Sequence, residues 1–206
     1  MPGTALNYTV AQIIRGPVNV FLDVASPAAG AELTIDSTDN IHTPDATANP
    51  SAVALGLFTG GMEVRIGQTF EHAEADQLTS AYRSAISADE VVLSPRGALQ
   101  FGGGATRFTN TAKLLQGVTA STPTGKRKLT GGGLTTVTYR TVLAIWAQAE
   151  DPTKYEYILL YRAFNDAGLA FTLSRKTDAS SDLAFRGFAD SSRTAGDQIY
   201  QWVFKT

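Results

Sequence analysis

The sequence contains no cysteine, and it has only two histidines and two methionines among its 206 residues. The absence of cysteine excludes a disulfide framework and a thiolate metal site. No segment carries a recognisable nucleophile, phosphate-binding or metal-binding motif. These absences predict a protein that is not an enzyme and that uses no cofactor and no metal.

Long apolar runs are missing as well. Residues 134–148 form the most apolar segment, but Arg140 and several threonines interrupt it, and no run approaches the roughly 18 residues of a membrane helix. The start of the chain lacks the basic region and the long apolar core of a secretory signal. We expect a single domain over residues 1–206 without a membrane segment, because all-β folds often reach this length undivided.

Charge is sparse and unevenly distributed. Charged residues make up 17% of the chain and the net charge is −2. Residues 1–90 carry eleven acids and three bases, whereas residues 91–206 carry eight acids and fourteen bases. This split is either chance variation in a small protein or the mark of a subunit whose acidic and basic faces meet head to tail. The nearly balanced total argues against a dedicated nucleic-acid binder.

What is abundant is β-strand pattern. Thr, Val, Ile, Phe and Tyr alternate with polar residues between Gly-, Asn- and Asp-rich turns, most clearly over residues 155–190. The pattern predicts a β-sandwich or barrel of about nine strands. The expected strands cover residues 18–24, 31–35, 62–70, 82–86, 90–93, 134–147, 155–163, 169–174, 183–188 and 199–204. We expect the first two of these strands to form an N-terminal hairpin.

One short flanking helix is expected at residues 111–116. Asn110 is a suitable N-terminal cap for it, and Gly117 stands where helices commonly stop. The glycine triplets at residues 102–104 and 131–133 match no phosphate-binding or dinucleotide motif. We interpret both triplets as flexible loops.

Residues 37–60 have no clear period and contain two prolines. We therefore expect a long loop, and long loops in compact domains are commonly functional or disordered. Its apolar residues are expected either to dock on a neighbouring subunit or to fold back onto the core of the same domain. These candidate inter-subunit residues are Ile41, Val53, Leu55, Leu57 and Phe58.

Several groups of polar residues are candidate sites. The stretch at residues 71–76 combines His72 with carboxylates, which suggests a metal site or, more simply, a solvated strand end. The adjacent carboxylates at residues 89–90 and 150–151 point to opposite faces of a strand and do not converge on a substrate. The basic run Lys126-Arg127-Lys128 lacks interleaved aromatic residues, so contact with an acidic partner or simple solvation is favoured over nucleic-acid binding.

The chain resembles the major tail tube proteins of long-tailed, siphovirus-like bacteriophages. The resemblance covers most of the chain through three groups of segments. The first runs from VNVFLDV through AELTID to LGLFTGG; the second is EVRIGQTFEHAEADQ followed by TSAYRSAISADEVVLSP; the third is YEYILLYRAFNDAGLAFTLSRK, LAFRGFAD and GDQIYQWVF.

This resemblance implies a β-sandwich or barrel with one flanking helix, assembled into hexameric rings that stack into a tube. It implies a location in the virion tail after assembly in the host cytoplasm, with tape measure, terminator and baseplate proteins as partners. The matching inter-ring loop is residues 37–60. The resemblance further implies that DNA passes through the lumen during ejection without specific binding, since a basic wall would retain it. The candidate lumen-facing acids are Glu63, Glu71, Glu74 and Asp76.

Two other interpretations remain open at this point. One is a related phage structural protein, such as a tail terminator, a baseplate ring or a capsid decoration protein. The other is a carbohydrate-binding β-sandwich, for which Trp146 and Trp202 are the available tryptophans. Both tryptophans lie within apolar strand patterns, which favours a role in the core.

Overall fold

The computed structural model describes residues 6–14, 17–38, 41–73, 83–96, 104–133, 136–169 and 183–205. The described part is mainly β, with a single helix, as the sequence predicts. The elements are β1 (Leu6–Ile14), β2 (Val18–Leu22), β3 (Ile35–Thr38), β4 (Ile41–Pro44), β5 (Val53–Phe58), β6 (Met62–Ala73), β7 (Arg83–Pro95), α1 (Gly104–Leu114), β8 (Val118–Ser121), β9 (Lys128–Gly131), β10 (Arg140–Ala147), β11 (Tyr155–Asn165), β12 (Phe185–Gly187) and β13 (Tyr200–Phe204).

One nine-stranded sheet forms the body, and every strand pair in it is antiparallel. Its order is β1-β6-β7-β12-β11-β10-β2-β5. Two strands pair with different parts of β11: its first half pairs with β13, and its last three residues pair with β12. Two separate two-stranded sheets, β3–β4 and β8–β9, complete the described strands.

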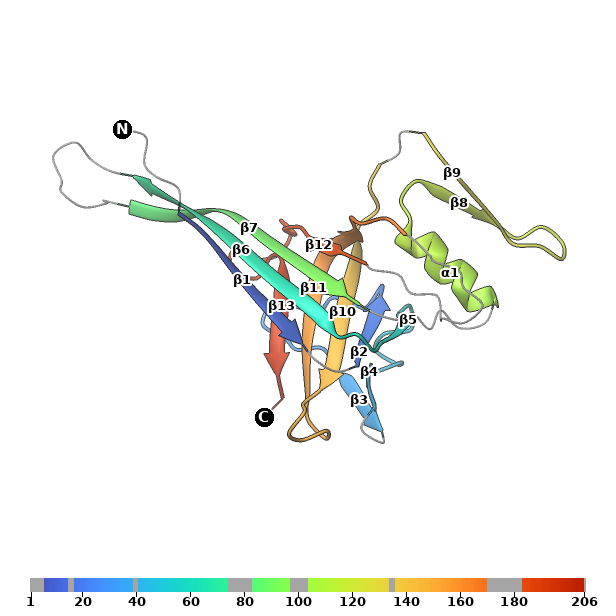
Figure 1. The fold of residues 1–206 in the computed structure, drawn as a ribbon, viewed down its shortest axis with the longest axis horizontal. Coiled ribbons are helices and arrows are strands. Elements are labelled where there is room, and N and C mark those ends of the chain that lie inside the picture. Colours follow the sequence, from blue (N-terminus) through green and yellow to red (C-terminus); the bar gives the residue numbers. More distant parts are fainter. Residues whose placement is uncertain are drawn as a thin grey trace.

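The sheet folds over itself and encloses the main core. One cluster of buried apolar side chains combines Val64 and Val91 from β6 and β7 with Val20, Ala144 and Ile158 from β2, β10 and β11. The ribbon shows β6 and β7 crossing over β10 and β11 (Figure 1). Because apolar side chains from both halves meet in one cluster, the two halves pack as the layers of a sandwich.

A second core lies on the other face of β10 and β11. It contains Leu143 and Leu159, and the segment after β2 covers them with Leu33. β10 and β11 are therefore buried on both faces, which explains their almost continuous apolar sequences. In β6, by contrast, Met62 and Val64 are buried and the intervening positions are more exposed, which confirms the predicted period of two.

The predicted N-terminal hairpin is wrong. Residues 31–34 form no strand, and β3 begins only at Ile35 and pairs with β4. β2 pairs instead with β10 and β5, two strands that lie far from each other in the sequence. The physical reason is that β2 is an inner strand of the sheet, so it has two partners and is covered on both faces.

The expectation of a loop at residues 37–60 is also corrected. The segment contains most of the β3–β4 hairpin and all of β5, which pairs with β2. Leu55 and Phe58 are fully buried in the main core, so they are not free to dock on another subunit. Val53 and Leu57 are half-buried, and Ile41 alone among the five candidates is strongly exposed, at 59%.

The helix is longer than predicted and begins earlier. α1 spans Gly104–Leu114, so Asn110 is not its N-terminal cap but a buried residue of its second half. The Asn110 amide Nδ2 donates to the carbonyl of Ala54 at 3.1 Å, which fastens α1 to the edge strand β5. Gly117 lies just beyond the helix with φ of +65°, a conformation that suits a helix stop. Gly104 is helical, and residues 102 and 103 lie outside the described part.

Other strand boundaries differ in instructive ways. The expected strands at 82–86 and 90–93 are parts of one strand, β7. β10 begins only at Arg140, later than expected, whereas β1 was not predicted at all. β12 and β13 lie within the strands expected at 183–188 and 199–204. The expected strand at 169–174 lies almost entirely outside the described residues.

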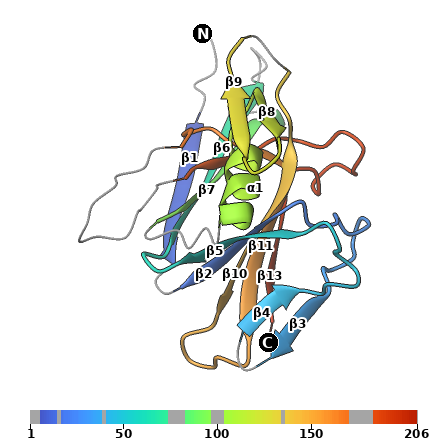
Figure 2. The ribbon, with the colours of Figure 1, turned by 90° about the vertical axis from the view of Figure 1, so that its right-hand side faces the viewer.

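Two hairpins project from opposite ends of the long axis (Figure 1). The β6–β7 hairpin, flanked by β1, extends on the left, while α1 and the β8–β9 hairpin lie on the right. The β3–β4 hairpin and the turn between β10 and β11 form the lower end in both views (Figure 2). No helix in the described part is long and apolar enough to cross a membrane.

Candidate functional site

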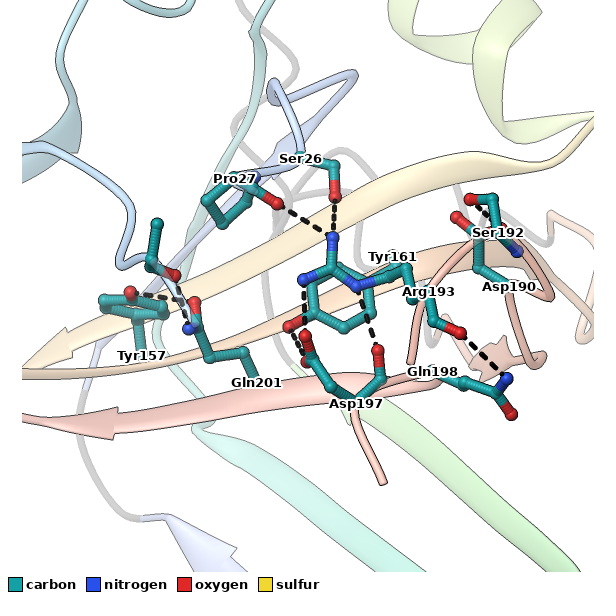
Figure 3. Close-up of polar contacts among 11 residues, drawn as sticks. Ser26, Pro27, Tyr157, Tyr161, Asp190, Ser192, Arg193, Asp197, Gln198 and Gln201 are labelled. Carbon is teal, nitrogen blue, oxygen red and sulfur yellow. Dashed lines mark hydrogen bonds and ion pairs between the residues drawn. The ribbon is translucent and has the colours of Figure 1, made fainter. Parts of the chain in front are cut away.

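Arg193 fastens the loop between β2 and β3 to the C-terminal part of the chain (Figure 3). Its Nη1 donates to the carbonyl of Pro27 at 2.8 Å and to the hydroxyl of Ser26 at 3.1 Å. Its Nε and Nη2 donate to the backbone carbonyl and the carboxylate of Asp197 at 2.9 and 2.7 Å. One nearly buried guanidinium thus joins two loops that are about 170 residues apart in sequence, using the fork geometry that lysine lacks.

Tyr161 completes this cluster. Its hydroxyl donates to Asp197 Oδ1 at 2.6 Å, and the Arg193 guanidinium lies over its ring. The hydrogen bond from Tyr161, and then the bond and charge of Arg193, lower the pKa of Asp197 despite its partial burial. Burial, followed by the bond to Asp197, raises the pKa of Tyr161. The charges and donors satisfy one another, so the cluster acts as a structural clasp between the two loops.

A second anchor holds the start of β3 and the residues before it. The backbone N–H of Leu33 donates to the Tyr157 hydroxyl at 3.0 Å. The Tyr157 hydroxyl donates to Gln201 Oε1 at 3.2 Å, and Gln201 Nε2 donates to the carbonyl of Ala31 at 2.8 Å (Figure 3). Residues 31–35 are therefore held in place by side chains of β11 and β13, although they begin outside any strand.

These anchors support a surface of exposed carboxylates. Glu32 and Asp36 lie on the anchored segment and are exposed, as is Glu150 in the β10–β11 turn. His42 links the two regions, because its Nε2 contacts the carbonyl of Pro152 at 3.0 Å. We call this end of the molecule the acidic end; its carboxylates are Glu32, Asp36, Asp45, Glu150 and Asp151, and β4 also carries the exposed Ile41.

A surface of opposite charge lies on the β8–β9 hairpin. Lys126, Arg127 and Lys128 are all exposed, and none of them forms an ion pair with a described residue. The turn is defined by a hydrogen bond from the Lys126 N–H to the Pro123 carbonyl at 2.9 Å. Gly125 has φ of +72° in this turn. Residues 118–131 thus form a hairpin, which we call the basic hairpin.

Two of the four candidate lumen acids, Glu63 and Glu71, lie within the described residues. Glu63 is on β6 and forms an ion pair with Arg96, so its negative charge is largely offset. The backbone of Glu71 lies in β6, opposite Ala85. Glu74 and Asp76 lie outside the described residues, and with them most of the acidic stretch weighed as a metal site. Among the described residues, no three His, Asp or Glu side chains gather as metal ligands.

One cavity lies between α1 and the basic hairpin. It has a volume of about 400 Å³, and its lining includes Lys113, Gln116 and Arg140. Asp23 forms ion pairs with both Lys113 and Arg140. Partial burial acts to raise the pKa of Asp23, but hydrogen bonds from Lys113 and then Arg140 lower it overall. The two cations therefore stabilise the helix position, and the single carboxylate of Asp23 offsets only one of their two positive charges.

The two tryptophans belong to the core region. Trp146 is 8% exposed, and Trp202 packs against the main cluster. Sequence reasoning missed a different aromatic cluster, in which Phe164 and Phe188 stack at 5.3 Å and Tyr139 meets both edge-on. Its members come from segments distant in sequence, and no periodicity joins them. A tryptophan-lined sugar cleft is thus not part of the described structure.

In comparisons with known proteins, no family model matches the chain, and no curated protein is significantly similar to it in sequence.

Proposed function

We propose that this protein is a structural subunit that self-assembles into hexameric rings, and that the rings stack to form the tail tube of a long-tailed phage. The observation that carries the proposal is the open edge of the main sheet. β1 pairs with β6 along nine residues, and no described residue pairs with its other edge. An unpaired edge of this length is a template for pairing with another chain.

A second edge supports the same conclusion. β13 pairs with β11 on one side only within the described residues. It ends at Phe204, which is 53% exposed and stacks on Trp202. Edges and exposed aromatic side chains are liabilities in a monomer but become contacts in a closed ring, where each subunit offers one edge to the next.

The proposed role in DNA ejection concerns the wall of the tube. A conduit for DNA works best with a weakly charged or acidic wall, because clustered Lys and Arg would bind phosphates. The Glu63–Arg96 ion pair reduces the contribution of Glu63, so the proposed acidic wall depends on Glu71, Glu74 and Asp76. We further propose contacts with tape measure, terminator and baseplate proteins in the virion tail, after assembly in the host cytoplasm.

Negative-stain electron microscopy of the purified protein over a range of concentrations tests this proposal, with light scattering to measure mass. Stacked rings or tubes are the expected result. Single closed rings that never stack would favour a terminator or a baseplate ring instead. A protein that stays monomeric at high concentration, even when tail initiator components are added, contradicts the proposal.

The exposed Ile41 provides a variant for the same experiment. Because its side chain is 59% exposed, Ile41→Asp should leave folding intact and weaken assembly. Thr106→Asp, at an exposed position of α1 away from this surface, is the control for an added charge. Equal assembly by wild type and both variants would remove Ile41 from the contact surface.

A further inference from the structure

We infer that the basic hairpin of one copy binds the acidic end of a second copy, and that this contact gives the assembly its direction. The inference deepens the proposed function and depends on self-association. The two partners are the exposed Lys126, Arg127 and Lys128 on one side, and the carboxylates around Ile41 on the other.

The two surfaces are far apart on one molecule. The basic hairpin lies beside α1 in the upper part of both views, whereas β3, β4 and the β10–β11 turn form the lower end (Figures 1 and 2). The basic residues therefore do not neutralise these carboxylates within the same chain. Two different, complementary patches on one subunit produce a heterologous contact, which propagates in one direction as rings or filaments.

Charge is concentrated on each surface. Residues 118–131 contain three basic residues and no acid. At the acidic end, Glu32, Asp36 and Glu150 are exposed and form no ion pair with a described residue. The nearest described cation in the β10–β11 turn, Lys154, already lies 3.9 Å from Asp151. Complementary potentials of this kind steer association and fix its register.

Both surfaces are also held in a defined shape. The acidic segment is anchored through Leu33 to Tyr157 and through Ala31 to Gln201. The basic hairpin is held by its β8–β9 ladder and by the turn at Gly125. Preorganised surfaces lose less conformational entropy on binding than mobile loops do. Ile41 adds an exposed apolar side chain on β4, and protein interfaces commonly combine apolar and polar side chains.

A charge swap tests the inference. One variant carries Lys126→Glu, Arg127→Glu and Lys128→Glu, and the other carries Glu32→Lys, Asp36→Lys and Glu150→Lys. Sedimentation velocity and negative-stain microscopy at several salt concentrations measure assembly of each variant alone, of their equimolar mixture and of the wild type. Urea unfolding of each variant shows that it folds. Arg107→Glu on α1, an exposed residue, is the matched control for Arg127→Glu.

Each triple variant alone should raise the protein concentration needed for assembly by about tenfold or more, because like charges then face each other. The mixture should assemble as the wild type does, since each reversed surface meets an opposite one. Added salt should weaken wild-type assembly. Wild-type assembly by both folded triple variants, or a mixture that fails to recover, overturns the inference.

The outcomes separate this inference from the proposed function. Tubes formed equally by the wild type and both triple variants would leave the tube proposal standing and remove this contact. Suppose instead that the wild type forms salt-sensitive open filaments, that mixing the two triple variants restores them, and that no closed rings appear. This result would support the contact and contradict the proposed tube. A wild type that does not self-associate at any concentration overturns both.

Discussion

The guanidinium carbon of Arg193 lies 3.7 Å from the centre of the Tyr161 ring, and both side chains bind the carboxylate of Asp197. The Arg193 side chain is only 8% exposed. Its remaining donors reach Ser26 and Pro27, so this one residue connects the loop after β2, the strand β11 and the loop before β13.

Arg193→Lys should lower the free energy of unfolding by about 2 kcal/mol, because lysine cannot donate to all four acceptors and cannot stack in the same way. Urea unfolding followed by tyrosine and tryptophan fluorescence measures this loss. The matched control is Arg186→Lys, whose side chain is 45% exposed and bridges Glu90 and Asp166 at the surface. If Arg193→Lys lowers the free energy of unfolding by no more than Arg186→Lys does, the cluster of Arg193, Tyr161 and Asp197 contributes little to stability.

Acid should destabilise the fold through Asp23 and Asp197. Hydrogen bonds lower the pKa of each in the folded state below the ordinary value of 3.8. The unfolded chain therefore binds these protons at a higher pH than the folded chain does. Their stabilising contribution is complete above the ordinary value and is lost as the pH falls below it. Urea midpoints measured between about pH 7 and pH 2.5 should decline mainly in the acid range.

Asp23→Asn isolates one part of this effect. Asp23 has φ of +57°, a left-handed conformation that asparagine also tolerates, so the backbone is preserved. The variant should lose about 2 kcal/mol at neutral pH, because Lys113 and Arg140 lose a charged acceptor. Its stability should also fall less steeply in acid than that of the wild type. An unchanged pH dependence would assign the acid sensitivity to other carboxylates.

Gly187→Ala should destabilise the junction of the sheet by about 1–3 kcal/mol through overpacking. A Cβ at this position would meet Ile199 at 3.1 Å, Leu160 at 3.3 Å and the Val91 carbonyl at 3.5 Å. Gly131→Ala is the control, since its nearest contact would be an ordinary 3.6 Å from Val118. Thermal unfolding compares the two variants. If the Gly187→Ala protein is as stable as the Gly131→Ala protein, the side chains of Ile199 and Leu160 can move enough to accept the added methyl group.

Leu55→Ala and Phe58→Ala should each cost about 3 kcal/mol or more, because both side chains are fully buried in the main core. Leu57→Ala, at a half-buried position between them, should cost less. Unfolding measurements on the three variants, at a concentration where they are monomeric, decide whether Leu55 and Phe58 belong to the core or dock on another subunit. Small losses at positions 55 and 58, combined with loss of assembly, would restore the inter-subunit interpretation.

The sequence predicted the fold class and most strands of the body because their apolar periods are local. It failed where the decisive interaction is distant. β5 escaped prediction because Gly56, with φ of +125°, lies at a register shift against β2, and the extra residue breaks the alternation. Asn110 was interpreted as a cap, since the Ala54 carbonyl that binds its amide lies 56 residues away in sequence.

The candidate surfaces were predictable to different degrees. Lys126, Arg127 and Lys128 form a run in sequence, so their shared surface was evident, although the hairpin that presents them was not. No local pattern predicts the acidic end, because the segments that carry Glu32 and Glu150 are positioned by the distant contacts of Leu33 with Tyr157 and of His42 with Pro152. The Glu63–Arg96 pair likewise joins residues 33 positions apart, which no local pattern reveals.

β12 has only three residues, yet its pairs with β7 and β11 are what join the two halves of the main sheet in the described structure. Hydrogen bonds therefore connect the two halves only through this short strand, and the apolar side chains of the main core supply the rest of the contact between them. A force on the β6–β7 hairpin, as when a neighbouring subunit pulls on it, would pass to the other half through the packing of this core as well as through β12.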